Sequence, residues 1–338
     1  MGVLAVLRTV VFSGKESIEN RNTGTPFSTW VNGHQTLVFV FLAYSLSWSV
    51  FIGLAVFRVD SPLVMLGVYG PSLAAILLSG YLVGWQGIRN LLVRITIWRV
   101  GLRWYAILLF GFVAIEIAGY GFYRLSGGAA LSITVPTLAS LLPVLLIQVL
   151  VPGFGEEFGW RGFVLPRLQA RWSPVIASVV LSLIHLFWHF PTYWLGIGTH
   201  NVPLVLMIAW IVPFTILYTW IYNNTQGSIL IAVLYHALFG VTLSFMPFLP
   251  SESVVPITPT LIGTFTFTSV FGPYLAVTAL FWVVAIVVAV ATRGRLGYVD
   301  RLDPVAACLP RRRPSQTPCY CAHHARPRAG HHRRSKVS

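Results

Sequence analysis

Eight long apolar runs, separated by short polar segments, limit what this chain can fold into more than any other feature. They cover residues 36–57, 63–84, 104–123, 133–152, 174–190, 202–222, 227–247 and 270–292. A helix needs about 20 apolar residues to cross the roughly 30 Å of hydrocarbon in a bilayer. The sequence therefore predicts an all-α fold, a polytopic membrane helix bundle with about eight transmembrane helices.

The charge content agrees with a membrane protein. Only 9% of the 338 residues are charged and 56% are hydrophobic, whereas about 25% of the residues of a soluble domain are charged. The net charge of +14 resides in loops and in the C-terminal tail, so membrane lipids are a simpler partner than nucleic acid. We expect an integral, multi-pass protein of the cell membrane.

Basic residues predict three regions and an orientation. Residues 1–35 form a polar N-terminal segment, residues 36–292 the transmembrane helical domain, and residues 293–338 a basic, Cys- and His-containing tail that is disordered by composition. Placing both termini in the cytoplasm leaves only Arg58 and Arg124 outside. Basic residues gather on the cytoplasmic side of membrane proteins, so this orientation is favoured.

Two further basic stretches lie between apolar runs. Residues 85–103 carry four arginines among apolar side chains, which predicts an amphipathic basic helix on the inner membrane surface. Arg161, Arg167 and Arg171 follow the fourth run, and we expect them to mark an aqueous side.

Glu156 and Glu157 stand side by side just after the fourth apolar run, although the whole chain has only nine acidic residues. A charged side chain near the membrane centre costs about 2.5–3.5 kcal/mol, so both need partners. Residues four apart share a helix face, so Arg161 can neutralise Glu157. Glu156 points about 100° away from Glu157 and is expected to meet a group from another helix.

Three histidines within apolar runs are candidates for that group. His185 and His189 are four residues apart on the fifth run, and His236 lies on the seventh. Unpaired polar groups are costly in hydrocarbon. We therefore expect Glu156 and the three histidines to share one polar site that is assembled from several helices.

Such a set can activate water in two ways. Histidine and carboxylate ligands can hold Zn²⁺ with an open position for water. Alternatively, without a metal, Glu156 acts as general base while histidines orient water and polarise a carbonyl. A transporter that relays protons through the same residues is a third interpretation, although the chain lacks the internal repeat that transporters often carry.

The motifs, taken together and in their order along the chain, indicate a protein family. Glu156-Glu157-x-x-x-Arg161 is followed by Trp188-His189-Phe190-Pro191, then by Gln226-Gly227-Ser228 and His236. Across about residues 136–246, this arrangement resembles the CAAX-prenyl-protease-2 and bacteriocin-processing (CPBP, or Abi) family of intramembrane proteases.

The resemblance implies an endopeptidase that cuts a peptide bond near the cytoplasmic membrane face. Glu156 would activate the water, Glu157 and Arg161 would support the helix, and His189 and His236 would complete the site. If the mechanism uses zinc, the implied ligands are Glu156, His189 and His236; a metal-free glutamate mechanism fits equally. The implied substrate is a peptide or the C-terminus of a prenylated protein. The oligomeric state does not follow from the sequence.

Two positions depart from the family's pattern. His185 stands where the family usually has Phe, and Gly240 stands where it usually has Asn or Asp. The missing side chain is the expected oxyanion donor, and loss of one such donor costs about 10²–10³ in rate. Either His185, Asn223 or Asn224 replaces it, or the chain is a weakened or inactive relative that acts as a membrane binding or immunity protein.

Overall fold

The computed structural model describes residues 25–59, 62–131, 137–195, 204–245 and 272–299. All regular elements in these ranges are helices, as predicted. Six are long and apolar enough to cross a membrane: Gln35–Val56, Val64–Val83, Leu102–Leu125, Leu138–Gln169, Leu206–Asn224 and Gly272–Ala291. Two shorter apolar helices, Pro174–Trp188 and Ile229–Phe245, complete the eight. The prediction of a polytopic helical bundle is confirmed, and the predicted orientation stays a prediction.

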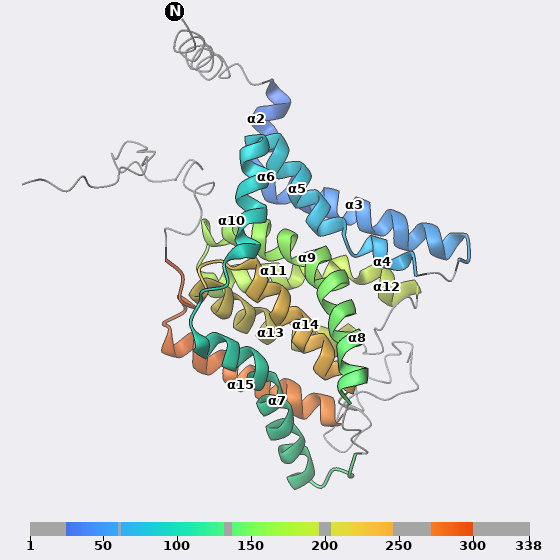
Figure 1. Ribbon diagram of the computed structural model, residues 1–338, viewed down its shortest axis with the longest axis vertical. Helices are drawn as coiled ribbons and strands as arrows, with labels where there is room; N and C mark the ends of the chain where they lie inside the picture. Colours follow the sequence, from blue (N-terminus) through green and yellow to red (C-terminus); the bar gives the residue numbers. More distant parts are fainter. Residues whose placement is uncertain (1–24, 60–61, 132–136, 196–203, 246–271, 300–338) are drawn as a thin grey trace, which may run out of the picture.

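The bundle has a central group of helices between two outer pairs (Figure 1). One outer pair is α3 (Gln35–Val56) and α5 (Gly70–Val83), which is preceded by the short α4 (Val64–Gly67). The other pair is α7 (Leu102–Leu125) and α15 (Gly272–Ala291). The centre contains α9 (Phe154–Gly159), α11 (Pro174–Trp188), α13 (Leu204–Asn224) and α14 (Ile229–Phe245), and α12 (Phe190–Leu195) follows α11.

The fourth apolar run continues as one interrupted helix, Leu138–Gln169, rather than ending near residue 152. Two wide π turns, η2 (Val149–Gly153) and η3 (Trp160–Val164), separate its α-helical parts α8 (Leu138–Gln148), α9 and α10 (Leu165–Gln169). Pro152 lies inside η2. Proline has no N–H and its ring crowds the carbonyl one turn earlier, and wide turns of this kind are frequent at functional sites.

This continuation makes one prediction wrong. Arg161 and Arg167 do not mark an aqueous side, because they are only 1% and 6% exposed. Arg167 donates to Gln35 Oε1 at 2.7 Å and to the Phe163 carbonyl at 2.8 Å. Of the three arginines, only Arg171 is exposed. Position in the sequence could not reveal that the first two arginines face protein groups rather than water.

The predicted basic helix over residues 85–103 is correct only in part. Helix α6 (Trp85–Leu92) passes into the short η1 (Val93–Thr96), and the chain from 97 to 101 is not helical. Arg89 is exposed, but Arg94 turns inward and donates to the Gly162 carbonyl at 3.2 Å and to the Tyr222 hydroxyl at 3.1 Å. Arg94 thus ties this segment to the bundle rather than facing the membrane surface.

Two stretches beyond the predicted transmembrane domain also have defined structure. Helix α2 (Pro26–Gly33) begins after Thr25, whose side chain accepts a hydrogen bond from the Ser28 amide. Leu296, at the start of the predicted tail, is fully buried, and its carbonyl accepts from Asn223 at 3.2 Å. The rest of the predicted tail, 300–338, lies outside the described residues.

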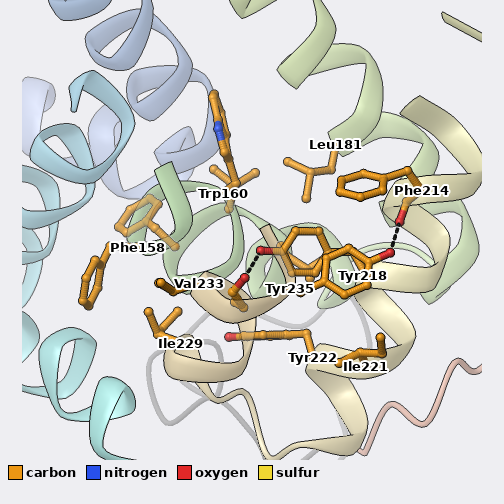
Figure 2. Packing of buried hydrophobic residues seen from close by; sticks show 14 of the residues in the cluster. Phe158, Trp160, Leu181, Phe214, Tyr218, Ile221, Tyr222, Ile229, Val233 and Tyr235 are labelled. Carbon is orange, nitrogen blue, oxygen red and sulfur yellow. Dashed lines mark hydrogen bonds between the residues drawn. The ribbon is translucent and has the colours of Figure 1, made fainter. Parts of the chain in front are cut away.

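The central helices meet through aromatic side chains (Figure 2). The rings of Tyr218 on α13 and Tyr235 on α14 lie 4.1 Å apart, and both are buried. Each hydroxyl donates to a backbone carbonyl, that of Tyr218 to Ala232 and that of Tyr235 to Phe214. Buried tyrosines need such partners, and these bonds fix α13 against α14.

Helix α9 packs directly on the backbone of α5 and of Val68 just before it, because a glycine of α9 faces each of them. A Cβ on Gly155 would lie 2.9 Å from the Val68 carbonyl oxygen, and a Cβ on Gly159 would lie 2.6 Å from that of Pro71. Small residues four apart let membrane helices approach closely. The Ser72 hydroxyl adds a hydrogen bond to the Phe154 carbonyl at 2.8 Å. Both glutamates therefore stand on a helix with little freedom to move.

We expect Gly159→Ala to lower stability by about 1–3 kcal/mol, the usual cost of overpacking, because backbone rather than a movable side chain blocks the new methyl group. The matched control is Gly121→Ala on α7, where a Cβ would meet nothing within 4 Å. Thermal unfolding of the detergent-solubilised protein measures both. Equal melting temperatures for the two variants would contradict this packing.

Candidate active site

Glu156 meets a histidine from another helix, as the sequence predicted. Its side chain is 3% exposed, and its Oε2 lies 2.8 Å from His185 Nε2 on α11. The same oxygen accepts from Trp160 Nε1 at 3.2 Å. The ring of His189, which directly follows α11, stacks on that of His185 with centroids 4.9 Å apart. Donor atoms of both histidines lie within 4.8 Å of Glu156.

Glu157 binds on a different side. Its Oε1 accepts from Arg161 Nη1 at 3.1 Å, which is the predicted pair, and also lies 2.7 Å from His236 Nδ1 on α14. The Arg161 guanidinium lies over the ring of Tyr218 at 3.6 Å from its centroid. An ion pair and the face of an aromatic ring together offset the cost of burying this cation.

The protons of two histidines follow from these contacts. An ionised carboxylate only accepts hydrogen bonds, so if Glu156 is ionised, Nε2 of His185 carries the proton that faces it. By the same argument, Nδ1 of His236 carries the proton that faces Glu157. In the neutral form of each ring, the opposite nitrogen is then an acceptor. The carboxylates thus set the tautomer of both imidazoles.

The six predicted site residues therefore form one polar cluster from three helical segments. Its members are Glu156, Glu157, Arg161, His185, His189 and His236. Elsewhere the helices around them are mainly apolar, so the cluster is a polar island within the bundle. The dielectric constant of such an interior is lower than that of water. Charges that face one another there therefore interact more strongly than they would in water.

Two donor groups in the cluster have the composition of a metal site. Glu156, His185 and His189 have donor atoms within 4.8 Å of one another, and so do Glu156, Glu157 and His236. His189 and His236 thus fall into different groups that share Glu156. One carboxylate with two imidazoles is a common zinc set, so the first group fits this metal. In the second, Glu157 is already paired with Arg161.

The end of α11 that carries the histidines is fixed by α3. Trp48 Nε1 donates to the Trp188 carbonyl at 3.0 Å, and Trp188 Nε1 donates to Ser47 Oγ at 2.7 Å. Trp188 is 1% exposed and lies between His185 and His189 in the sequence order. The Trp-His pair singled out in the sequence is therefore both a structural anchor and a member of the site.

The Gln226-Gly227-Ser228 motif makes the turn that places His236. Gln226 and Gly227 have φ values of 59° and 70°, a conformation that glycine adopts without strain. Ser228 Oγ then accepts from the Ile231 amide at 3.1 Å and donates to the Ile97 carbonyl at 2.6 Å. This cap fixes the beginning of α14, two turns before His236.

Two of the predicted substitutes for the side chain missing at Gly240 have other contacts. Asn223 donates to the Leu296 carbonyl and accepts from Gln169, both at 3.2 Å. Asn224 donates to the Trp220 carbonyl at 2.8 Å. Both stand at the end of α13, beside the start of α14 and about three turns from Gly240.

Sequence reasoning missed Gln148, whose side chain fills the space beside Gly240. A Cβ on Gly240 would lie 2.3 Å from Gln148 Oε1, 2.4 Å from Cδ and 2.8 Å from Nε2. Gln148 is the last residue of α8. A signal was present, since this is a lone amide in the fourth apolar run, and polar residues inside membrane helices are often functional.

Residues 138–242, which include the whole polar cluster, match the model of a protein family described as type II CAAX prenyl endopeptidase Rce1-like. A curated relative, CAAX prenyl protease 2 of Methanococcus maripaludis, is 26% identical over 141 residues, which are 39% of this chain and 49% of the relative. The aligned part thus spans about half the length of that relative. Both matches confirm the resemblance seen in the motifs. Residues 138–242 are thus similar to the type II CAAX prenyl endopeptidases, in agreement with the family resemblance that the motifs predicted.

Proposed function

We propose that this protein is a CAAX-type intramembrane endopeptidase, in which Glu156 activates the water that hydrolyses a peptide bond near the cytoplasmic membrane face. The observation that carries the proposal is the buried Glu156 carboxylate, which lies 2.8 Å from His185 Nε2 within a cluster of three histidines. A carboxylate at hydrogen-bond distance from an imidazole in a dry site is suited to general acid–base chemistry.

The reaction needs one proton to move twice. Glu156 takes a proton from water as the water oxygen bonds to the carbonyl carbon, and the π electrons of the carbonyl move to its oxygen. When the carbon–nitrogen bond breaks, Glu156 returns the proton to the departing amine nitrogen. His185 holds the carboxylate in place, while the half-buried His189 is suited to orient the water.

Glu157 and Arg161 have a supporting role in this mechanism. They keep the His236 ring in one orientation, because Glu157 Oε1 accepts from both Arg161 Nη1 and His236 Nδ1. His236 then presents its other nitrogen to the substrate side of the cluster. A ring held by a carboxylate in this manner is a recurrent device for fixing both tautomer and orientation.

The residues fit two versions of the mechanism, one metal-free and one that uses zinc. If zinc is bound, Glu156, His185 and His189 are the donor group that would hold it, and the metal would supply an acidified water and polarise the carbonyl. The substrate we propose is a peptide or the C-terminus of a prenylated protein, reached from the surrounding lipid.

A second candidate function rests on Gly240. If no group replaces the side chain that this position lacks, the chain is a binding or immunity protein that keeps the fold and the polar cluster without cleaving its partner. A variant without the Glu156 carboxylate would then keep the phenotype of the wild type. The two functions therefore differ in whether the phenotype depends on this carboxylate.

We expect Glu156→Gln to lower peptide cleavage by about 10²–10⁴-fold, because the amide cannot take a proton from water. The control is Glu116→Gln, a change at another buried carboxylate, which lies on α7 outside the cluster. The assay uses protein in lipid vesicles, with a farnesylated CAAX peptide and the same peptide without the lipid. If wild type cleaves and Glu156→Gln cleaves equally fast, Glu156 has no part in the chemistry.

The supporting pair should show its effect on stability. Removing one partner of a buried ion pair costs about 3–5 kcal/mol, so Arg161→Met should lower the melting temperature strongly. The double variant Arg161→Met/Glu157→Gln should recover much of the loss, because no unpaired charge remains. Glu156→Gln serves as the comparison that keeps this pair intact. A single Arg161→Met variant as stable as wild type would argue against the supporting role.

A further inference from the structure

The space that a side chain at position 240 would occupy is filled from another helix. The three terminal heavy atoms of Gln148 all lie within 2.8 Å of where a Cβ on Gly240 would stand. Helices α8 and α14 run side by side over this region (Figure 1). Gly240 on α14 therefore leaves room for the amide of Gln148 on α8, and the two positions depend on each other.

This amide packs against a residue one turn of α14 away from the polar cluster. Gly240 follows His236 by one turn of α14, so both face the same neighbour. That neighbour is the interrupted helix, which gives Gln148 to Gly240 and Glu157 to His236. The wide turn η2 between Gln148 and the glutamates holds about one residue more than an α turn, which turns Gln148 toward the side of the helix that carries them.

The side chain of Gln148 is half-buried. None of the hydrogen bonds among the described residues uses its amide group. A carboxamide in an apolar helix is costly to keep without a partner. An amide that packs against Gly240 and bonds to no described residue is suited to bind something that enters the site.

Peptide hydrolysis needs an N–H donor for the developing oxyanion, and donors of three residues in this cluster are already directed to carboxylates. His185 and His236 direct their protons to carboxylates, and Arg161 is paired with Glu157 under Tyr218. The carboxamide of Gln148 offers two N–H donors without adding charge. Such a donor lowers the barrier because it meets the charge only as that charge forms.

We infer that Gln148 donates an N–H to the carbonyl oxygen of the bound peptide, and so supplies from α8 the amide that α14 lacks at Gly240. The inference rests on the proposed peptidase function and adds a further catalytic residue to it. Hydrolysis then proceeds with the same bonds made and broken, while the oxyanion is held by Gln148.

The test exchanges the amide between the two helices. Gln148→Ala should lower kcat by about 10²–10³-fold with little change in KM, as expected for the loss of one oxyanion donor. Gly240→Asn alone should crowd Gln148 and lower the melting temperature. The double variant Gln148→Ala/Gly240→Asn should regain stability and at least about tenfold of the lost kcat. Gln86→Ala, on the exposed side of α6, is the matched control.

The outcomes separate this inference from the proposed function. If wild type cleaves the peptides, Glu156→Gln does not, and Gln148→Ala retains kcat within about threefold, Gln148 is not the donor while the peptidase stands. Failure of the double variant to exceed Gln148→Ala in kcat also overturns the inference. If wild type cleaves neither peptide, the proposed function fails and the role of Gln148 fails with it. Melting temperatures of the same variants show whether a loss is structural.

Discussion

The fold depends on a buried ion pair whose two members are also held by other helices. Glu157 and Arg161 are each at most 1% exposed, and their 3.1 Å contact lies within one helix. Glu157 reaches α14 through His236, and Arg161 reaches α13 through Tyr218. Either charge alone would be very costly in this interior. The pair therefore fixes the positions of three segments, and Glu156, the next residue in the chain, is fixed with them.

The two adjacent glutamates have separate partners because the helix directs them to separate neighbours. Oε1 of Glu157 accepts from a cation and an imidazole, whereas Glu156 meets only the N–H groups of His185 and Trp160. The proposed chemistry at Glu156 and the proposed supporting role of Glu157 rest on this difference in partners.

Local periodicity was enough to predict much of this arrangement. The eight apolar runs, the Glu157–Arg161 pair and the common face of His185 and His189 all follow from helix geometry. The sequence could not show that Arg161 and Arg167 are buried, because Tyr218 and Gln35, which contact them, come from other helices. The sequence also could not predict the position of Gln148, because only the packing of α8 on α14 brings its amide to Gly240.

The wide turn η2 has a consequence for how this segment can vary. Five residues, Val149–Gly153, span the distance between Gln148 and the helix that carries the glutamates. Because a π turn contains an additional residue relative to an α turn, deleting one residue here can restore a regular α turn and leave the later side chains facing the same neighbours. The same deletion in a regular α-helical part would rotate every later side chain by about 100°. The length of this helix is therefore less constrained at η2 than in the regular turns on either side of it.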